Sequence, residues 1–295
     1  MLQPFQEAIV VVVTVLLYAT IQSILETFTP RFQTIRFIMF FLVIITVADY
    51  VIEAFIYMKQ LTEIFTTFFI AFLPLVTMIL ALLQSVLLFI SWTPVVLFIV
   101  QALIYFCDKL LLPLLIISVV LDVSTRLYPE LSFHRLAQLI RKSIFSFVAA
   151  AVVGLSSVLT VSGLSWFTVR ESIVSPVKKM IEQNIPIIGS LLVEGVSLMK
   201  GFQVTATTLT GWAIVTTMLV LCFTPVCLLL IKAFTLLFLG AITEPLLEKQ
   251  TSQLLDDLGN AVLLLCAVSL LLAIGFTLTW LVIFLLFQIG TGKVL

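Results

Sequence analysis

The stretch from Arg170 to Gly201, RESIVSPVKKMIEQNIPIIGSLLVEGVSLMKG, separates two long apolar parts of the chain. Charged residues recur along it, so it does not have the pattern of a simple bilayer crossing. Its first part is amphipathic, and Pro186 ends that helix. The next piece, residues 186–200, is about 15 residues long, whereas a crossing helix needs about 20. The pattern therefore predicts a re-entrant segment that holds Glu194 or, equally well, an amphipathic connector lying on the headgroups.

The composition decides the class of protein. Hydrophobic residues make up 62% of the chain and charged residues only 10%. A soluble domain is typically about half apolar and about a quarter charged. The sequence therefore predicts an all-α, polytopic integral membrane protein that is surrounded by the lipid bilayer. Because the formal net charge is zero, no basic surface points to nucleic acid.

About eight hydrophobic segments follow one another along the chain, and each is a candidate transmembrane helix. They cover residues 8–24, 35–57, 64–90, 95–121, 144–167, two segments within 204–247 divided near Pro225, and 261–288. An interfacial amphipathic helix near 132–143 leads into the fifth segment. In that segment, small residues at 150, 154 and 157 share one side, which predicts close packing of a neighbouring helix.

These segments divide the chain into three parts. Residues 1–167 form an N-terminal membrane half with five segments, 168–203 form the central polar stretch, and 204–295 form a C-terminal half with three. Residues 92–102 (WTPVVLFIVQA) align with 223–233 (FTPVCLLLIKA), and other proline motifs match in the same order. This order slightly favours an internal duplication, with an inverted repeat as its consequence. Coincidence between two apolar sequences is the alternative.

Ionisable residues inside the apolar segments are the candidate functional residues, because each is costly in hydrocarbon unless it faces protein, water or a partner. Asp49 is four residues from Glu53 and shares its helix face. Asp108 and Lys109 are adjacent, so their side chains should diverge. We hypothesise that Asp49, Asp108, Lys109, Lys232 and Glu194 border a polar path or a subunit contact. Mutual neutralisation in the helix bundle, for example of Asp108 by Lys232, is the slightly favoured alternative.

Enzyme chemistry finds little support in the residues. The only histidine is His134, so a zinc site with two histidines cannot be built. Neither a Gly-x-x-x-x-Gly-Lys-Ser/Thr nor a Gly-x-Gly-x-x-Gly motif occurs, which removes the usual nucleotide signatures. We therefore expect a non-enzymatic protein without catalytic, cofactor-binding or metal-binding residues.

A succession of short motifs resembles a known family along nearly the whole chain. The motifs are FLPL at 72–75, LLLPLL at 110–115, LAQLIR at 136–141, IPIIG at 185–189, the turn at Pro225 and EPL at 244–246. In their order they are similar to the stage III sporulation protein AE family. No single motif is distinctive, and the resemblance lies in their sequence along a polytopic chain.

The resemblance implies a place in the multi-component assembly that joins mother cell and forespore during endospore formation. We expect a multi-pass protein of the mother-cell-derived membrane that supports a channel or secretion assembly. Its expected partners are other stage III sporulation membrane proteins. The alternative is an autonomous secondary transporter built from inverted repeats, in which Asp49 and Asp108 would couple ions.

Overall fold

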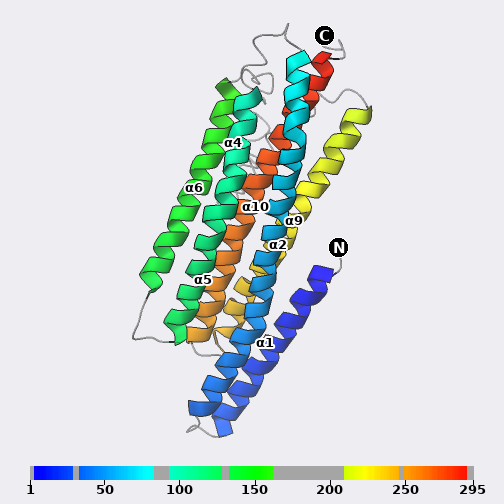
Figure 1. Cartoon of the computed structure of the whole chain (residues 1–295). Helices are drawn as coiled ribbons and strands as arrows, with labels where there is room; N and C mark the ends of the chain where they lie inside the picture. Colours follow the sequence, from blue (N-terminus) through cyan, green and yellow to red (C-terminus); the bar gives the residue numbers. More distant parts are fainter. Residues whose placement is uncertain are drawn as a thin grey trace, which may run out of the picture. The chain divides into compact units, whose positions relative to one another are not determined.

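The computed structural model describes residues 3–28, 33–82, 93–127, 133–161, 209–245 and 249–290, and nearly all of them are helical. The helices are α1 (Gln3–Phe28), α2 (Gln33–Leu82), α4 (Thr93–Phe106), α5 (Leu112–Leu127), α6 (His134–Val161), α9 (Leu209–Thr243) and α10 (Lys249–Gly290) (Figure 1). A π-helical turn, η1 (Cys107–Leu111), joins α4 to α5. The expected all-helical class is confirmed in this part of the chain.

Six helical stretches in the described residues are long and apolar enough to cross a membrane. They are Phe5–Ile24, Ile38–Ala71, Phe98–Leu127, His134–Ser157, Cys222–Thr243 and Lys249–Thr279. The multi-helix membrane architecture agrees with the sequence, whereas the expected count of eight is not confirmed. The central polar stretch, residues 168–203 with Glu194, lies outside the described residues.

Several boundaries expected from the sequence are absent because helices continue through polar residues. Helix α2 has 50 residues and contains the segment expected at 35–57 together with residues 64–82 of the segment expected at 64–90. The residues between them, MKQLTE at 58–63, are mostly good helix formers, so polarity alone does not end the helix. Pro74 also stands inside α2. At about 1.5 Å per residue α2 is about 75 Å long, more than twice the hydrocarbon thickness of about 30 Å.

The C-terminal helices show the same behaviour. Helix α9 runs through Pro225 for 35 residues, so the division expected there is absent from the described part. Helix α10 begins at Lys249, so it includes Asp256 and Asp257, which precede the segment expected at 261–288. Buried leucines at 254, 255 and 258 recur at helical spacing in its first turns and explain this early start.

Helix α6 joins the expected interfacial helix and the fifth segment without a break. The small residues Ala150, Gly154 and Ser157 are exposed on it. An added Cβ at Gly154 would meet nothing within 4 Å. The predicted close packing of a neighbouring helix on this side is therefore not confirmed within the described residues.

The chain forms two compact units, and long helices contribute to both. The charged unit consists of Met1–Lys59, Leu110–Phe145 and Val226–Cys266, and the apolar unit of Gln60–Lys109, Ser146–Pro225 and Ala267–Leu295. In the described part of the apolar unit, the charged residues are Glu63, Asp108 and Lys109. All other charged residues of the described ranges belong to the charged unit.

Helix α10 supplies the core of each unit. In its most apolar stretch 89% of the residues are buried, as expected for a helix that is hydrophobic all round. In the apolar unit, the Phe276 ring stacks on Phe65 with 4.6 Å between centroids, and Phe68 meets it edge-on at 4.8 Å. In the charged unit, a Cβ added at Gly259 would lie 2.8 Å from the Cγ of Leu237, so α10 and α9 approach closely there.

Candidate functional site

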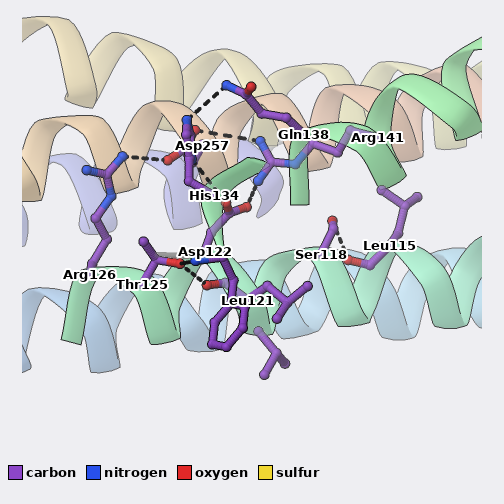
Figure 2. Close-up of polar contacts among 12 residues, drawn as sticks. Leu115, Ser118, Leu121, Asp122, Thr125, Arg126, His134, Gln138, Arg141 and Asp257 are labelled. Atoms are coloured by element: carbon purple, nitrogen blue, oxygen red, sulfur yellow. Dashed lines mark hydrogen bonds and ion pairs between the residues drawn. The ribbon is translucent and has the colours of Figure 1, made fainter. Parts of the chain in front are cut away.

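Polar side chains of α5, α6 and α10 converge in the charged unit, as Figure 2 shows. We call them the arginine–aspartate cluster; its members are Asp122, Arg126, His134, Arg141 and Asp257. Helical periodicity explains why α5 and α6 each contribute two members, while α10 contributes one. Asp122 and Arg126 are four residues apart on α5, and His134 and Arg141 are seven apart on α6, so each pair shares a face.

Asp122 is at the centre of the cluster, and its side chain is 0% exposed. Its carboxylate forms an ion pair with the guanidinium of Arg141. The Nδ1 atom of His134 lies 3.8 Å from Asp122 Oδ1. Arg141 also reaches α10, with Nη1 at 3.7 Å from Asp257 Oδ1. This one arginine therefore connects carboxylates from two helices.

Arg126 makes the second connection between helices. Its Nη2 donates to Asp257 Oδ2 at 2.9 Å, and its Nη1 donates to Gln253 Oε1 at 2.6 Å. Both acceptors are on α10, four residues apart. The fork of the guanidinium thus fits two acceptors on one helix face, an arrangement that specifies the register between α5 and α10.

The same cluster has ligand types that could hold a metal ion. Ligand atoms of Asp122, His134 and Asp257 all lie within 4.8 Å of one another. However, the two carboxylates already face the guanidiniums of Arg126 and Arg141, and the two negative and two positive charges cancel. A divalent cation would have to displace both arginines. The geometry therefore favours an interhelical ion-pair cluster over a metal centre.

A second polar site surrounds Lys232 of α9, whose side chain is only 8% exposed. Its Nζ donates to Glu53 Oε2 of α2 at 2.6 Å and lies 3.6 Å from Glu7 Oε2 of α1. The ammonium also lies 4.1 Å from the centroid of the Tyr50 ring, within the range of a cation–π contact. We call these residues the Lys232 site.

A groove of about 590 Å³ opens beside the Lys232 site, between α1 and α2. Its lining includes the carboxylates of Glu7, Asp49 and Glu53 next to apolar side chains of both helices. Asp49 is exposed and forms no ion pair within the described residues. Two of these three carboxylates, those of Glu7 and Glu53, contact the single ammonium of Lys232, so acidic groups outnumber basic ones at the groove.

The structure brings together some of the residues singled out in the sequence. Asp49 and Glu53 line the same groove, as their spacing indicates. The expectation that Asp108 and Lys109 diverge is wrong: they form an ion pair at 2.7 Å in the apolar unit, where the π-helical turn changes the local backbone. For the example pairing of Asp108 with Lys232, the structure gives each residue a partner in its own unit: Lys232 contacts Glu53 and Glu7, and Asp108 pairs with Lys109.

The arginine–aspartate cluster was not among the expected sites. Its members at 122 and 126 follow the segment expected at 95–121, Arg141 falls in the expected interfacial helix near 132–143, and Asp257 lies between the last two expected segments. The available signal was the repeated spacing of four: aspartate and arginine at 122 and 126, glutamine and aspartate at 253 and 257. This spacing marks a shared helix face, but residues 122–126 and 253–257 lie outside the segments that were expected to be helical.

Comparison with known protein families matches residues 1–286 to the family described as Stage III sporulation protein AE. This range contains both polar sites. No curated protein and no solved structure gives a significant match to the chain.

Proposed function

We propose that this chain, which belongs to the stage III sporulation protein AE family, is a non-enzymatic membrane component of the mother cell–forespore channel or secretion assembly. The single observation that carries the proposal is the family match over residues 1–286, which indicates a role in stage III of sporulation. The six membrane-length helices in the described residues support a multi-pass protein. Its membrane in this proposal is the mother-cell-derived membrane around the forespore.

In this proposal the protein works through partners, and the groove beside Lys232 is a contact for one of them. Asp49 lies within Ile38–Ala71, a stretch apolar enough to cross a membrane. An unpaired carboxylate at the centre of a membrane helix costs about 2.5–3.5 kcal/mol, which a cationic partner would offset. The excess negative charge of the groove therefore fits a basic side chain from another stage III sporulation membrane protein.

In this proposal, the Lys232 site fixes the positions of the two helices that form the contact surface. Lys232 contacts carboxylates from α1 and α2, and so connects the two helices that line the groove. Asp108 and Lys109 are less suited to the same role, because each already has the other as its ion-pair partner.

Photo-crosslinking in sporulating cells tests the contact. A photoreactive residue at Ile52 or Ile56, both in the groove lining, should capture another stage III sporulation membrane protein. Matched probes at Ile116 and Ile117, exposed residues of α5 in the same unit, should not. Identical products from both pairs of positions would contradict a specific contact at the groove.

Charge removal at Asp49 gives a second test. Asp49→Asn should weaken co-purification of the captured partner and reduce late spore development at unchanged protein level. Glu63→Gln is the control, because Glu63 is another exposed acid of α2 and does not line the groove. Equal effects of the two substitutions would contradict a special role for Asp49.

Two experiments address the function as a whole. Deleting the gene should arrest late spore development, and normal spores would contradict the sporulation role. The purified protein in liposomes should not catalyse ion-coupled solute uptake. Such uptake by the protein alone would establish an autonomous transporter in its place.

A further inference from the structure

Helix α6 separates its positive charges into an inward and an outward set. Arg141 and His134 point into the arginine–aspartate cluster. Arg135 and Lys142 are exposed on the same turns. Arg135, Leu139 and Lys142 have the spacing i, i+4, i+7 and so lie on one helix face. Leu139 between the two cations is 62% exposed.

The outward cations have no partner within the described residues. Neither Arg135 nor Lys142 forms an ion pair there, whereas Arg126 and Arg141 are both matched by aspartates. In hydrocarbon, two unpaired cations would be strongly unfavourable. In bulk water, the exposed leucine would be the unfavourable group. A phospholipid headgroup layer suits the cations and the leucine together. Its phosphates can pair with the cations, while the leucine contacts the start of the acyl chains.

We propose that the outward face formed by Arg135, Leu139 and Lys142 binds the phosphate groups of anionic phospholipids in the surrounding bilayer. The two cations are about 10 Å apart along the helix axis, at 1.5 Å per residue over seven residues. They therefore present two separated positive charges to the membrane surface. This inference stands on the charges and exposure of α6 and does not depend on the sporulation role.

The arginine–aspartate cluster includes residues from the same turns of α6 as the outward cations. Arg141 and Lys142 are neighbours in the chain, and His134 precedes Arg135 directly. If the outward cations lie among the headgroups, the inward groups of the same turns lie at the same depth. The cluster then joins α5, α6 and α10 where the membrane meets water, a level at which buried ion pairs are less costly than in hydrocarbon.

Native mass spectrometry of the full purified chain tests the lipid contact. With phosphatidylglycerol and phosphatidylcholine supplied together, the wild-type protein should retain phosphatidylglycerol preferentially. The double variant R135Q/K142Q should lose about 30-fold of this preference, the combined effect of two cations near an anionic surface. Soluble glycerol phosphate should not displace the lipid, since the leucine contact needs an acyl chain.

Two further variants make the test specific. K59Q/K249Q removes two other exposed cations of the charged unit and should leave the preference unchanged. R135K/K142R retains both charges and should also preserve it. An unchanged preference in R135Q/K142Q, or an equal loss in K59Q/K249Q, would overturn the proposal.

Salt gives the same test without any substitution. Raising the ionic strength screens exposed charges. The phosphatidylglycerol preference of the wild-type protein should therefore fall. A preference insensitive to salt would overturn the proposal even if the glutamine variant failed to fold.

Discussion

The helices within the charged unit and the helices within the apolar unit are held together by different interactions. In the charged unit, Arg126 and Arg141 make directional contacts to aspartates on neighbouring helices. In the described part of the apolar unit, aromatic rings around Phe276 stack at ordinary van der Waals distance. Lipid tails provide the same dispersion contacts as Phe or Leu, so apolar packing alone discriminates weakly between helix arrangements. Ion pairs add that discrimination, because each charge needs one specific partner.

This comparison predicts that the charged unit depends on single residues more than the apolar unit does. A buried charge without its partner is more costly than a missing apolar contact. In contrast, aromatic contacts are distributed over several rings. Three substitutions test this difference, and all can be measured by unfolding the full chain in mixed micelles.

The largest effect is expected for Asp122→Ala. Its carboxylate is fully buried and pairs with Arg141, so the substitution leaves a buried guanidinium without its main partner. Breaking such a pair typically costs about 3–5 kcal/mol. The free energy of unfolding, measured by denaturing-detergent titration, should fall by this amount.

Asp108→Asn is the matched control in the apolar unit. The Lys109 side chain of that ion pair is 64% exposed, so the substitution leaves no charge buried in the protein, and the free energy of unfolding should fall by less than for Asp122→Ala. If the two aspartate variants were equally destabilised, the distinction between buried and exposed ion pairs would break down.

A smaller loss is expected for Phe276→Ala in the apolar unit. The ring contacts Phe65 and Phe68, and its removal leaves a cavity. A cavity on the order of 100 Å³ costs about 2 kcal/mol at about 24 cal/mol per Å³. Phe276→Leu should recover most of the loss in the same titration. A loss larger than that of Asp122→Ala would reverse the comparison.

Small effects of opposite sign are expected at two glycines. At Gly259 an added Cβ would lie 2.8 Å from Leu237 Cγ and 3.1 Å from its backbone nitrogen, so Gly259→Ala should destabilise by about 1 kcal/mol, the low end for overpacking. Gly154→Ala meets open space and should be neutral or stabilising by up to about 1 kcal/mol, because alanine favours helix. Thermal unfolding of both variants checks the opposite signs.

Part of the candidate site was predictable from local spacing. Asp49 and Glu53 share a face because they are four residues apart, and both line the groove. The partner of Lys232 was not predictable, because periodicity places a lysine on a face of its own helix but does not say which helix lies opposite. For the same reason, the sequence could not show that Arg141 meets Asp122 and Asp257.

Helix boundaries were less predictable than helix existence. Residues 58–63 and 249–260 are rich in polar side chains, yet α2 and α10 continue through them. The polarity of a side chain indicates whether it can face water or lipid. Whether the segment is helical depends instead on the helix propensity of its residues and on the packing of its buried side. Pro74 and Pro225 lie inside helices in the same way, since one lost backbone hydrogen bond is small against the packing of a long helix.

The sequence by itself determined that this protein is helical and suited to a membrane. With 62% hydrophobic residues, backbone groups removed from water must bond within their own segment, and the helix is the local way to do so. Only the tertiary structure decided which charges on different helices meet: Arg126 with Asp257, and Lys232 with Glu53. Such pairings depend on which helices lie next to one another in three dimensions. The spacing of residues along one helix does not identify the helix that packs against it.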